Sequence, residues 1–302
     1  MIDYIIISLA VFCFAGQFAF TKLYESAVTQ KSAVTSLVML IITNSVGALL
    51  YLFIGGFRVQ LNLTSLLFAT LLAIVMIPYY MVGIKVLSLG SLAVYSMFMM
   101  LGGMLVPFFY GVFFLNEALS VAKIIGTVLL CLFIILQAFS QRSSESSSQN
   151  KKLGLFFALC VLIFFINGAT GVIAKAHQIS ADPIDEISFT FISCLLTTVF
   201  SALLLPFAYL KSKDAPILQI KSTLKLKPMI IMSLIGASAY TGSFLHLMAA
   251  SSVPASVQFP LVSGGVIVLS ALVSALIFKE KLSLREWLAV TGVCASTVLF
   301  AF

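Results

Sequence analysis

The stretch Ala255 to Ser283, ASVQFPLVSGGVIVLSALVSALIFKEKLS, decides the fold because an earlier stretch of the chain repeats its pattern. The earlier stretch, Ala93 to Ser120, reads AVYSMFMMLGGMLVPFFYGVFFLNEALS and begins 162 residues before it. Both are apolar runs with a Gly-Gly pair in the middle and a Glu-x-Leu-Ser exit. The matching positions are Gly102-Gly103 with Gly264-Gly265, and Glu117, Leu119 and Ser120 with Glu280, Leu282 and Ser283. The chain therefore contains one hydrophobic unit written twice.

The composition indicates an integral membrane protein. Of 302 residues, 61% are hydrophobic and only 9% are charged, which leaves too little polar surface to cover a water-soluble globule. A span needs roughly 20 mostly apolar residues. On that criterion the sequence predicts ten transmembrane helices, over residues 2 to 22, 33 to 54, 64 to 87, 92 to 115, 120 to 140, 153 to 176, 185 to 210, 228 to 249, 255 to 278 and 284 to 302. The predicted fold class is an all-α integral membrane protein.

The longest polar interruption divides these spans into two sets of five. Residues 140 to 152, SQRSSESSSQNKK, are Ser-rich and charged without apolar periodicity, so they predict a flexible linker. The predicted units are residues 1–140 and 153–302, joined by a linker over 141–152. Because five is odd, the second unit enters the membrane in the opposite sense, as in the inverted-topology repeats of many transporters. Lys22, which closes the first span, is echoed by Lys175 at the end of the sixth.

The basic residues predict the orientation of the chain. Loops after odd-numbered spans hold 14 of the 17 Lys and Arg residues. The positive-inside rule places those loops in the cytoplasm and both termini outside. The net charge of +7 then reflects loops beside anionic lipid and does not indicate a nucleic-acid partner. The five cysteines lie in predicted spans without CxxC spacing, so no zinc site, other metal site, cofactor or disulfide framework is expected.

Polar side chains inside the spans are the candidate substrate-binding groups, because such groups are costly in hydrocarbon and normally face a cavity or another helix. The candidates are Gln17, Tyr79, Tyr80, Tyr95, Asn167, Tyr240, Ser243 and Gln258. Ser96, Thr170 and Thr241 lie beside them. Each of these groups has a second interpretation, a helix-helix hydrogen bond of about 0.6 kcal/mol. As a set they favour a site between the two repeats, since they fall on equivalent helices of the two halves.

Other residues of the spans are expected to have roles in helix packing, helix breaks, capping or coupling. The Gly pairs predict close helix packing or a bend, with packing favoured, and Pro107 and Pro260 are candidates for helix breaks. All ten acidic residues lie at span ends or in loops, which does not support proton coupling through a buried acid. Glu280 is expected in a turn near Lys279, Lys281 or Arg285, and Ser283 to Glu286 fits a capping box. His246 is the candidate coupling residue, with a structural histidine as the alternative.

Two further segments each have two interpretations. The basic loop Lys211 to Pro228 is interpreted as a plain connector, with a short amphipathic segment on the membrane surface as the alternative. Gly236-Ala237-Ser238-Ala239 superficially resembles the Gly-x-Ser loop of intramembrane serine proteases. Ser238 and His246 are about 12 Å apart along a straight helix, too far for a nucleophile and its base. An enzyme is not expected.

Two five-span units, each with a Gly-bearing helix, a Glu-x-Leu-Ser turn and a final helix rich in small residues, resemble the EamA family of the drug/metabolite transporter superfamily. The residues that carry the resemblance are Glu117-Ala118-Leu119-Ser120 and Glu280-Lys281-Leu282-Ser283, and Ser263 to Ser283 also resembles the closing half of small multidrug resistance proteins. The resemblance implies a central cavity lined by spans 1, 3, 4, 6, 8 and 9. The small multidrug proteins use a membrane Glu in the first span, where this chain has Gln17, and many EamA proteins are described with cytoplasmic termini.

The expected function is secondary-active or facilitative transport, as an exporter or exchanger, of small polar or amphipathic metabolites such as amino acids, by alternating access. The first alternative is a proton-coupled multidrug exporter, and a non-transporting membrane scaffold or sensor is the alternative from another class. The expected partners are a small-molecule substrate and the lipid bilayer, with a monomer and a homodimer both left open. The expected location is a plasma membrane of the bacterial type.

Overall fold

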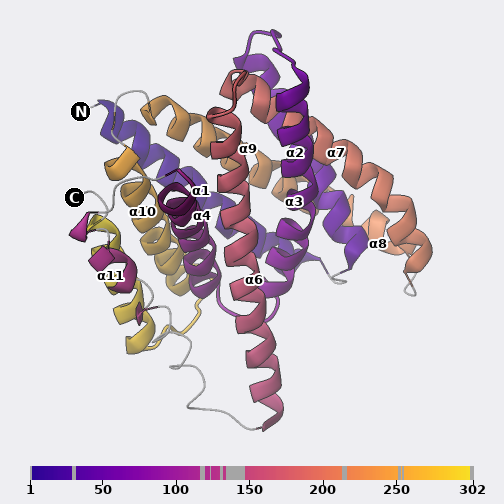
Figure 1. Cartoon of the computed structure of the whole chain (residues 1–302). Helices are drawn as coiled ribbons and strands as arrows, with labels where there is room; N and C mark the ends of the chain where they lie inside the picture. The colour runs from indigo at the N-terminus through magenta and orange to yellow at the C-terminus, as the bar shows by residue number, and fades with distance from the viewer. Residues whose placement is uncertain are drawn as a thin grey trace.

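The computed structural model describes residues 2–28, 32–115, 120–122, 124–129, 132–133, 147–212, 216–250, 253 and 255–299. The regular structure in these ranges is helical, and they contain no strand. The helices are α1 (Ile2–Ala27), α2 (Ala33–Ile54), α3 (Leu63–Leu87), α4 (Leu92–Phe114), α6 (Ser147–Gln178), α7 (Glu186–Lys211), α8 (Pro216–Thr223), α9 (Leu226–Ala250), α10 (Ala255–Leu276) and α11 (Leu284–Val298), drawn in Figure 1.

Seven of the described helices are long and apolar enough to cross a bilayer, and they are α1, α2, α3, α4, α6, α7 and α9. A further apolar stretch, Leu261–Leu276, lies in α10. Many large apolar side chains on these helices face outward, for example Phe12 and Phe207. An outward apolar surface on long helices is consistent with a membrane protein, because hydrocarbon takes the place of water around it.

Short polar side chains set the beginnings of several helices. The Ser32, Asn62, Ser91 and Asp185 side chains each accept a hydrogen bond from the backbone N–H three residues on. This satisfies one of the donors that a helix start leaves open. The predicted capping box at the start of α11 is confirmed: Ser283 N donates to Glu286 Oε2 at 2.6 Å, and Glu286 N donates to Ser283 Oγ at 3.3 Å.

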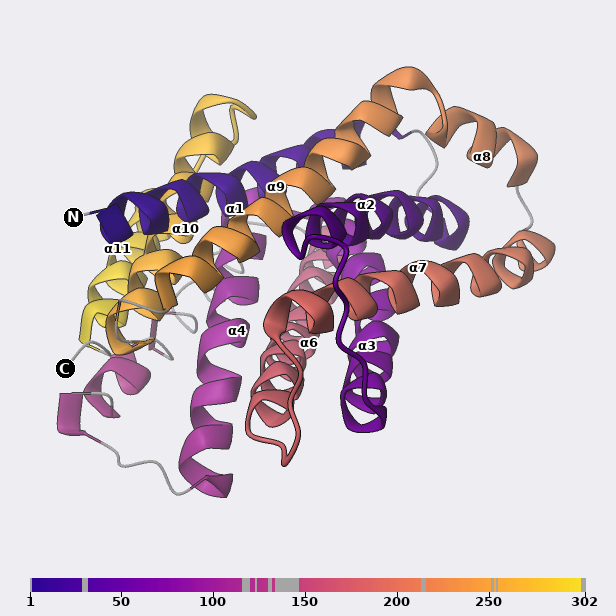
Figure 2. The same cartoon turned by 90° about the horizontal axis from the view of Figure 1, so that it is seen from above.

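Eight of the helices pack side by side in a closed ring. Its order is α1, α9, α2, α7, α3, α6, α4, α10 and back to α1, and α11 packs on the outside against α10 (Figure 2). Helices from the first and second halves of the chain alternate around the whole of this ring. Exchanging each helix of the first half for its counterpart in the second, α1 for α6, α2 for α7, α3 for α9 and α4 for α10, leaves the order unchanged.

Glycines of both Gly-Gly pairs lie close to a neighbouring helix, as the packing interpretation predicts. A Cβ on Gly102 would lie 2.1 Å from the Phe164 carbonyl oxygen of α6, and one on Gly265 would lie 2.9 Å from a Val11 side-chain carbon of α1. No side chain fits at Gly102 unless the two backbones separate. The prolines do not interrupt their helices, since α4 continues through Pro107 and α10 through Pro260.

The structure corrects the sequence predictions at several helix ends. α1 extends to Ala27, five residues beyond the predicted span. α6 begins at Ser147, so residues 147–152 of the predicted linker are helical, whereas 141–146 lie outside the described residues. A polar sequence continues a helix here because the hydrophobic span that follows has already nucleated it. The predicted fifth span, 120 to 140, lies mostly outside the described residues, as does Glu117.

The loop between α7 and α9 contains a short helix, α8, so its interpretation as a plain connector was wrong. α8 turns Gln219 and Thr223 inward and exposes Ile217 and Leu218. Ser32 Oγ donates a hydrogen bond to Gln219 Oε1 at 2.6 Å, which fastens α8 to the start of α2. The segment is therefore a short helix with two distinct faces, and its position on the membrane surface stays a prediction.

Candidate functional site

Six polar side chains gather inside the ring of helices and form what we call the central cluster. Its members are Gln17 of α1, Asn44 of α2, Tyr79 and Tyr80 of α3, Tyr95 of α4 and Tyr240 of α9. The four tyrosines are 3% to 7% exposed, and Asn44 is 1% exposed. Both halves of the chain contribute to the cluster, since Tyr240 belongs to the second half and the other five residues to the first.

Specific contacts connect the members of the central cluster. Tyr240 donates its hydroxyl to Asn44 Oδ1 at 2.6 Å, and the Asn44 amide donates to Leu40 O at 2.9 Å. The Tyr80 side chain interacts with Tyr240, and Tyr79 interacts with Gln17. The Tyr79 and Tyr80 rings meet edge to face with centroids 5.2 Å apart. These hydroxyl and amide groups bring hydrogen-bonding capacity, without any net charge, into an apolar ring of helices.

Glycines provide the room for two of the tyrosines. The Tyr240 ring lies against Gly47 of α2, where an added Cβ would approach a ring carbon to 2.3 Å. The Tyr95 hydroxyl lies over Gly83 of α3, where an added Cβ would come within 2.7 Å of the oxygen. The aromatic groups therefore reach the middle of the ring because neighbouring helices lack side chains at these positions.

The other predicted site residues lie apart from the central cluster and make helix-helix or local contacts. Asn167 donates to Met99 O of α4 at 2.6 Å, in the space that Gly103 leaves. Gln258 of α10 donates to the His246 carbonyl of α9, and the His246 ring meets Phe14 edge to face. Ser243 donates to Ala239 O of its own helix at 3.0 Å. The contacts of Asn167 and Gln258 join neighbouring helices, whereas that of Ser243 lies within its own helix.

Sequence reasoning missed Asn44 and overlooked Lys22. Asn44 is an amide within the 22-residue apolar helix α2, and that isolated polar group was the signal that could have revealed it. Lys22 was considered only as the end of a span. In the structure it forms an ion pair, with Nζ 3.3 Å from Glu280 Oε1. The expected neighbours of Glu280, Lys279 and Lys281, do not form this pair.

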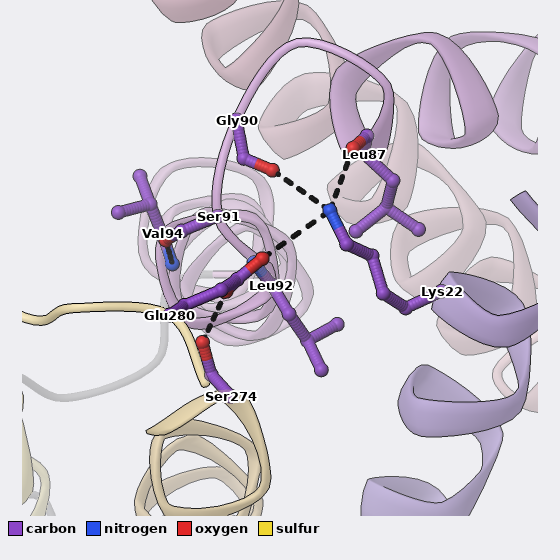
Figure 3. A network of polar contacts seen from close by, with 8 residues as sticks. All are labelled: Lys22, Leu87, Gly90, Ser91, Leu92, Val94, Ser274 and Glu280. Atoms are coloured by element: carbon purple, nitrogen blue, oxygen red, sulfur yellow. Dashed lines mark hydrogen bonds and ion pairs between the residues drawn. The ribbon is translucent and has the colours of Figure 1, made fainter. Parts of the chain in front are cut away.

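Figure 3 shows the Lys22–Glu280 network, which consists of these two side chains, Ser274 and backbone groups of Leu87, Gly90 and Leu92. Lys22 Nζ donates to Leu87 O at 2.9 Å and to Gly90 O at 3.2 Å. Glu280 accepts from Leu92 N at 3.1 Å and from the Ser274 hydroxyl. The network thus joins α1, the loop between α3 and α4, the start of α4 and the end of α10.

The turn that presents Glu280 contains a residue in a left-handed conformation. Lys279 has φ of +53°, and Glu280 N donates to Ser274 O at 3.0 Å. A non-glycine residue in this region costs about 1 kcal/mol or more.

Replacing Lys279 with glycine is therefore expected to stabilise the protein by about 1 kcal/mol, because glycine adopts this φ without a steric penalty. Thermal unfolding of the protein in detergent measures the change. Lys281→Gly is the matched control, since Lys281 has no positive φ and gains nothing from glycine. Equal stabilisation by both substitutions would contradict a strained turn at Lys279.

A groove of 520 Å³ opens between α1, α10 and α11. Its lining is mostly apolar and consists of Tyr4, Ile7, Ser8, Val11, Phe12, Leu261, Gly264, Gly265, Val268, Leu269 and Cys294. Phe12 precedes Lys22 by ten residues, which is about 15 Å along a helix. The groove and the Lys22–Glu280 network therefore occupy opposite ends of the contact between α1 and α10. The central cluster does not line this groove.

The fold is similar to that of a solved protein structure described only as the crystal structure of a protein, with a TM-score of 0.53 and 15% sequence identity. The similarity covers 97% of this chain and 96% of the other chain. No protein-family model and no curated protein sequence matches this chain. At this identity the likeness shows a shared helical fold over the whole length, and it carries no statement about activity or substrate.

Proposed function

We propose that the protein is a secondary-active or facilitative transporter of small polar or amphipathic metabolites, of the EamA type within the drug/metabolite transporter superfamily. In this proposal ten spans form two inverted five-helix repeats, and a substrate site between them opens alternately to the two sides. The order of helices around the ring supports the repeat, since exchanging the halves leaves that order unchanged. Inverted repeats of this kind place their substrate sites at the repeat interface.

The observation that carries the proposal is the central cluster. Hydroxyl and amide groups are costly in a lipid environment unless they have partners or face a cavity. Here Tyr79, Tyr80 and Tyr95 of the first half lie together, and Tyr80 meets Tyr240 of the second half inside the ring. Groups that exchange hydrogen bonds with one another in the closed ring can exchange them with a substrate when the helices separate. The cluster has no carboxylate or ammonium group, which favours substrates without a large net charge.

Transport by purified protein in liposomes tests this function. Vesicles are loaded in turn with amino acids, nucleosides and cationic drugs, and counterflow of the labelled solute is measured. At least one class is expected to exchange faster than in protein-free vesicles. Tyr80→Phe is expected to slow that exchange roughly five- to tenfold, the effect of one buried hydrogen bond of about 1 kcal/mol.

The matched control for Tyr80→Phe is Tyr110→Phe, which removes the same hydroxyl from a tyrosine that stacks on Phe114 near the end of α4. It is expected to leave the exchange rate unchanged. If no solute of the panel exchanges, although the protein is folded and inserted, the result would count against transport and favour the scaffold or sensor. If both substitutions slow the exchange equally, the result would contradict the assignment of the central cluster as the substrate site.

A further inference from the structure

The Lys22–Glu280 network places each charge at a helix end of complementary sign. The Lys22 ammonium lies among the carbonyl groups at the end of α3, where Leu87 O and Gly90 O accept its hydrogen bonds. The Glu280 carboxylate lies at the first turn of α4 and accepts from Leu92 N. A helix carries partial positive charge at its start and partial negative charge at its end, so both placements are favourable. Removing either side chain therefore disconnects several elements at once.

The ring is closed at the end that carries this network. Besides its neighbours in the ring, α1 reaches across to α3 and α4. In the part of the chain that the structure describes, its counterpart α6 makes no packing of comparable extent with α9 or α10. At the other end of the contact between α1 and α10, the two helices stay in contact through Gly265 and Val11, and the groove lies beside them. The two ends of the ring thus differ, although the order of helices is symmetric.

The Lys22–Glu280 pair is accessible enough to separate. The two side chains are 15% and 21% exposed, so water can reach both ions. Fully buried ions would pay a large desolvation penalty if they lost each other, whereas ions next to water are solvated again when they part. The strained turn at Lys279 lies beside this contact and is consistent with a segment that has two arrangements.

From these observations we propose that Lys22 and Glu280 are positioning residues that hold this end of the helix ring closed, and that they separate when the path to the central cluster opens from this side. This role rests on the proposed function in one respect, namely that the path to the central cluster is the route of a transported solute. Ser274, which donates its hydroxyl to Glu280, assists by fixing the carboxylate. The positive-inside count assigns this end to the cytoplasm, so the pair would control access from the cytoplasmic side.

Labelling of a buried cysteine tests this role without any transport measurement. Ser96 is fully buried on α4, one turn beyond Leu92, and Ser96→Cys is a nearly isosteric reporter. It is introduced after replacement of the native cysteines with alanine, at Cys13, Cys131, Cys160, Cys194 and Cys294. Inside-out and right-side-out membrane vesicles are treated with a membrane-impermeant maleimide. The rate of labelling is measured for the reporter alone and for each substitution of Lys22, Glu280 or Ser274.

Glu280→Gln and Lys22→Met are each expected to raise the labelling rate roughly tenfold, since the open population rises by the factor that the lost interaction had suppressed. The increase is expected from one side only, the side of inside-out vesicles. Lys22→Arg keeps the charge and is expected to label at nearly the rate of the reporter alone. Lys85→Met is the matched control, because Lys85 is an exposed lysine in the last turn of α3, close in sequence to Leu87, and it is not part of the Lys22–Glu280 network.

Unchanged labelling in Glu280→Gln and Lys22→Met, with both proteins monodisperse in size-exclusion chromatography, would overturn the proposal. If either variant does not fold, Ser274→Ala retains both charges and is expected to raise labelling roughly threefold; no increase there would also overturn it. Increased labelling in variants of a protein that moves no solute would leave the positioning role intact and remove the proposed function. Solute exchange without any change of labelling would leave the proposed function intact and remove the positioning role of Lys22 and Glu280.

Discussion

Gly102→Val is expected to destabilise the protein by about 3 kcal/mol or more, the upper part of the range for overpacked cores. The nearest atom to an added Cβ is the Phe164 carbonyl oxygen, at 2.1 Å, and the next nearest atoms are also backbone. A backbone atom cannot rotate away as the end of a flexible side chain does, so α4 and α6 must move apart. Denaturant-induced unfolding in mixed micelles measures the loss.

Gly154→Ala is the matched control for the packing of Gly102. Gly154 also lies in a helix, α6, but an added Cβ there meets nothing within 4 Å. Alanine has the higher helix propensity, so this substitution is expected to be neutral or to stabilise by up to about 1 kcal/mol. If Gly102→Val is no more destabilising than Gly154→Ala, the result would contradict the statement that α6 leaves no room for a side chain at Gly102.

Tyr240→Ala is expected to cost about 3 to 5 kcal/mol, as is usual when a large buried aromatic side chain is truncated. The ring fills the space over Gly47 and meets Tyr51 edge to face, with centroids 6.1 Å apart. Its hydroxyl also donates to Asn44 Oδ1, which truncation leaves without that donor in a buried position. Thermal unfolding of the detergent-solubilised protein measures the effect.

Two phenylalanine substitutions separate the ring of Tyr240 from its hydroxyl. Tyr240→Phe keeps the packing and is expected to cost about 1 to 2 kcal/mol, the value of one buried hydrogen bond with its unsatisfied partner. Tyr4→Phe removes a hydroxyl from a tyrosine that is 54% exposed and is expected to stay within about 0.5 kcal/mol of the unsubstituted protein. A Tyr240→Phe change as small as that of Tyr4→Phe would mean that the Asn44 hydrogen bond contributes nothing to stability.

Several helices could be predicted from the sequence almost to the residue. α2 occupies the predicted span 33 to 54, and α3, α7 and α9 begin and end within two residues of their predictions. These limits follow from the length of each apolar run and from the polar residues that bound it. The packing role of the Gly-Gly pairs and the capping box at Ser283 were also predictable, because each depends on residue type at a short spacing.

The polar contacts of the candidate site could be predicted only in part. The sequence identified Gln17, Tyr79, Tyr80, Tyr95 and Tyr240, and the structure brings these five together. It did not identify Asn44 as the partner of Tyr240, and it offered Asn167, Ser243 and Gln258 as equals, although Asn167 and Gln258 bond to neighbouring helices and Ser243 bonds to its own. A side chain's polarity shows that it needs a partner, whereas the rotation of its helix decides which partner it meets.

The sequence by itself determined that the helices are long and apolar, and it determined their approximate limits. It also determined the repeated Gly-Gly and Glu-x-Leu-Ser pattern and the list of polar groups within the spans. Each of these is a property of one stretch of chain. The tertiary structure alone decided the order of helices in the ring and the pairing of Lys22 with Glu280, which are 258 residues apart. The physical reason is that helix association depends on close approach at small residues and on hydrogen bonds between helices. Those terms exist only once the helices lie beside one another.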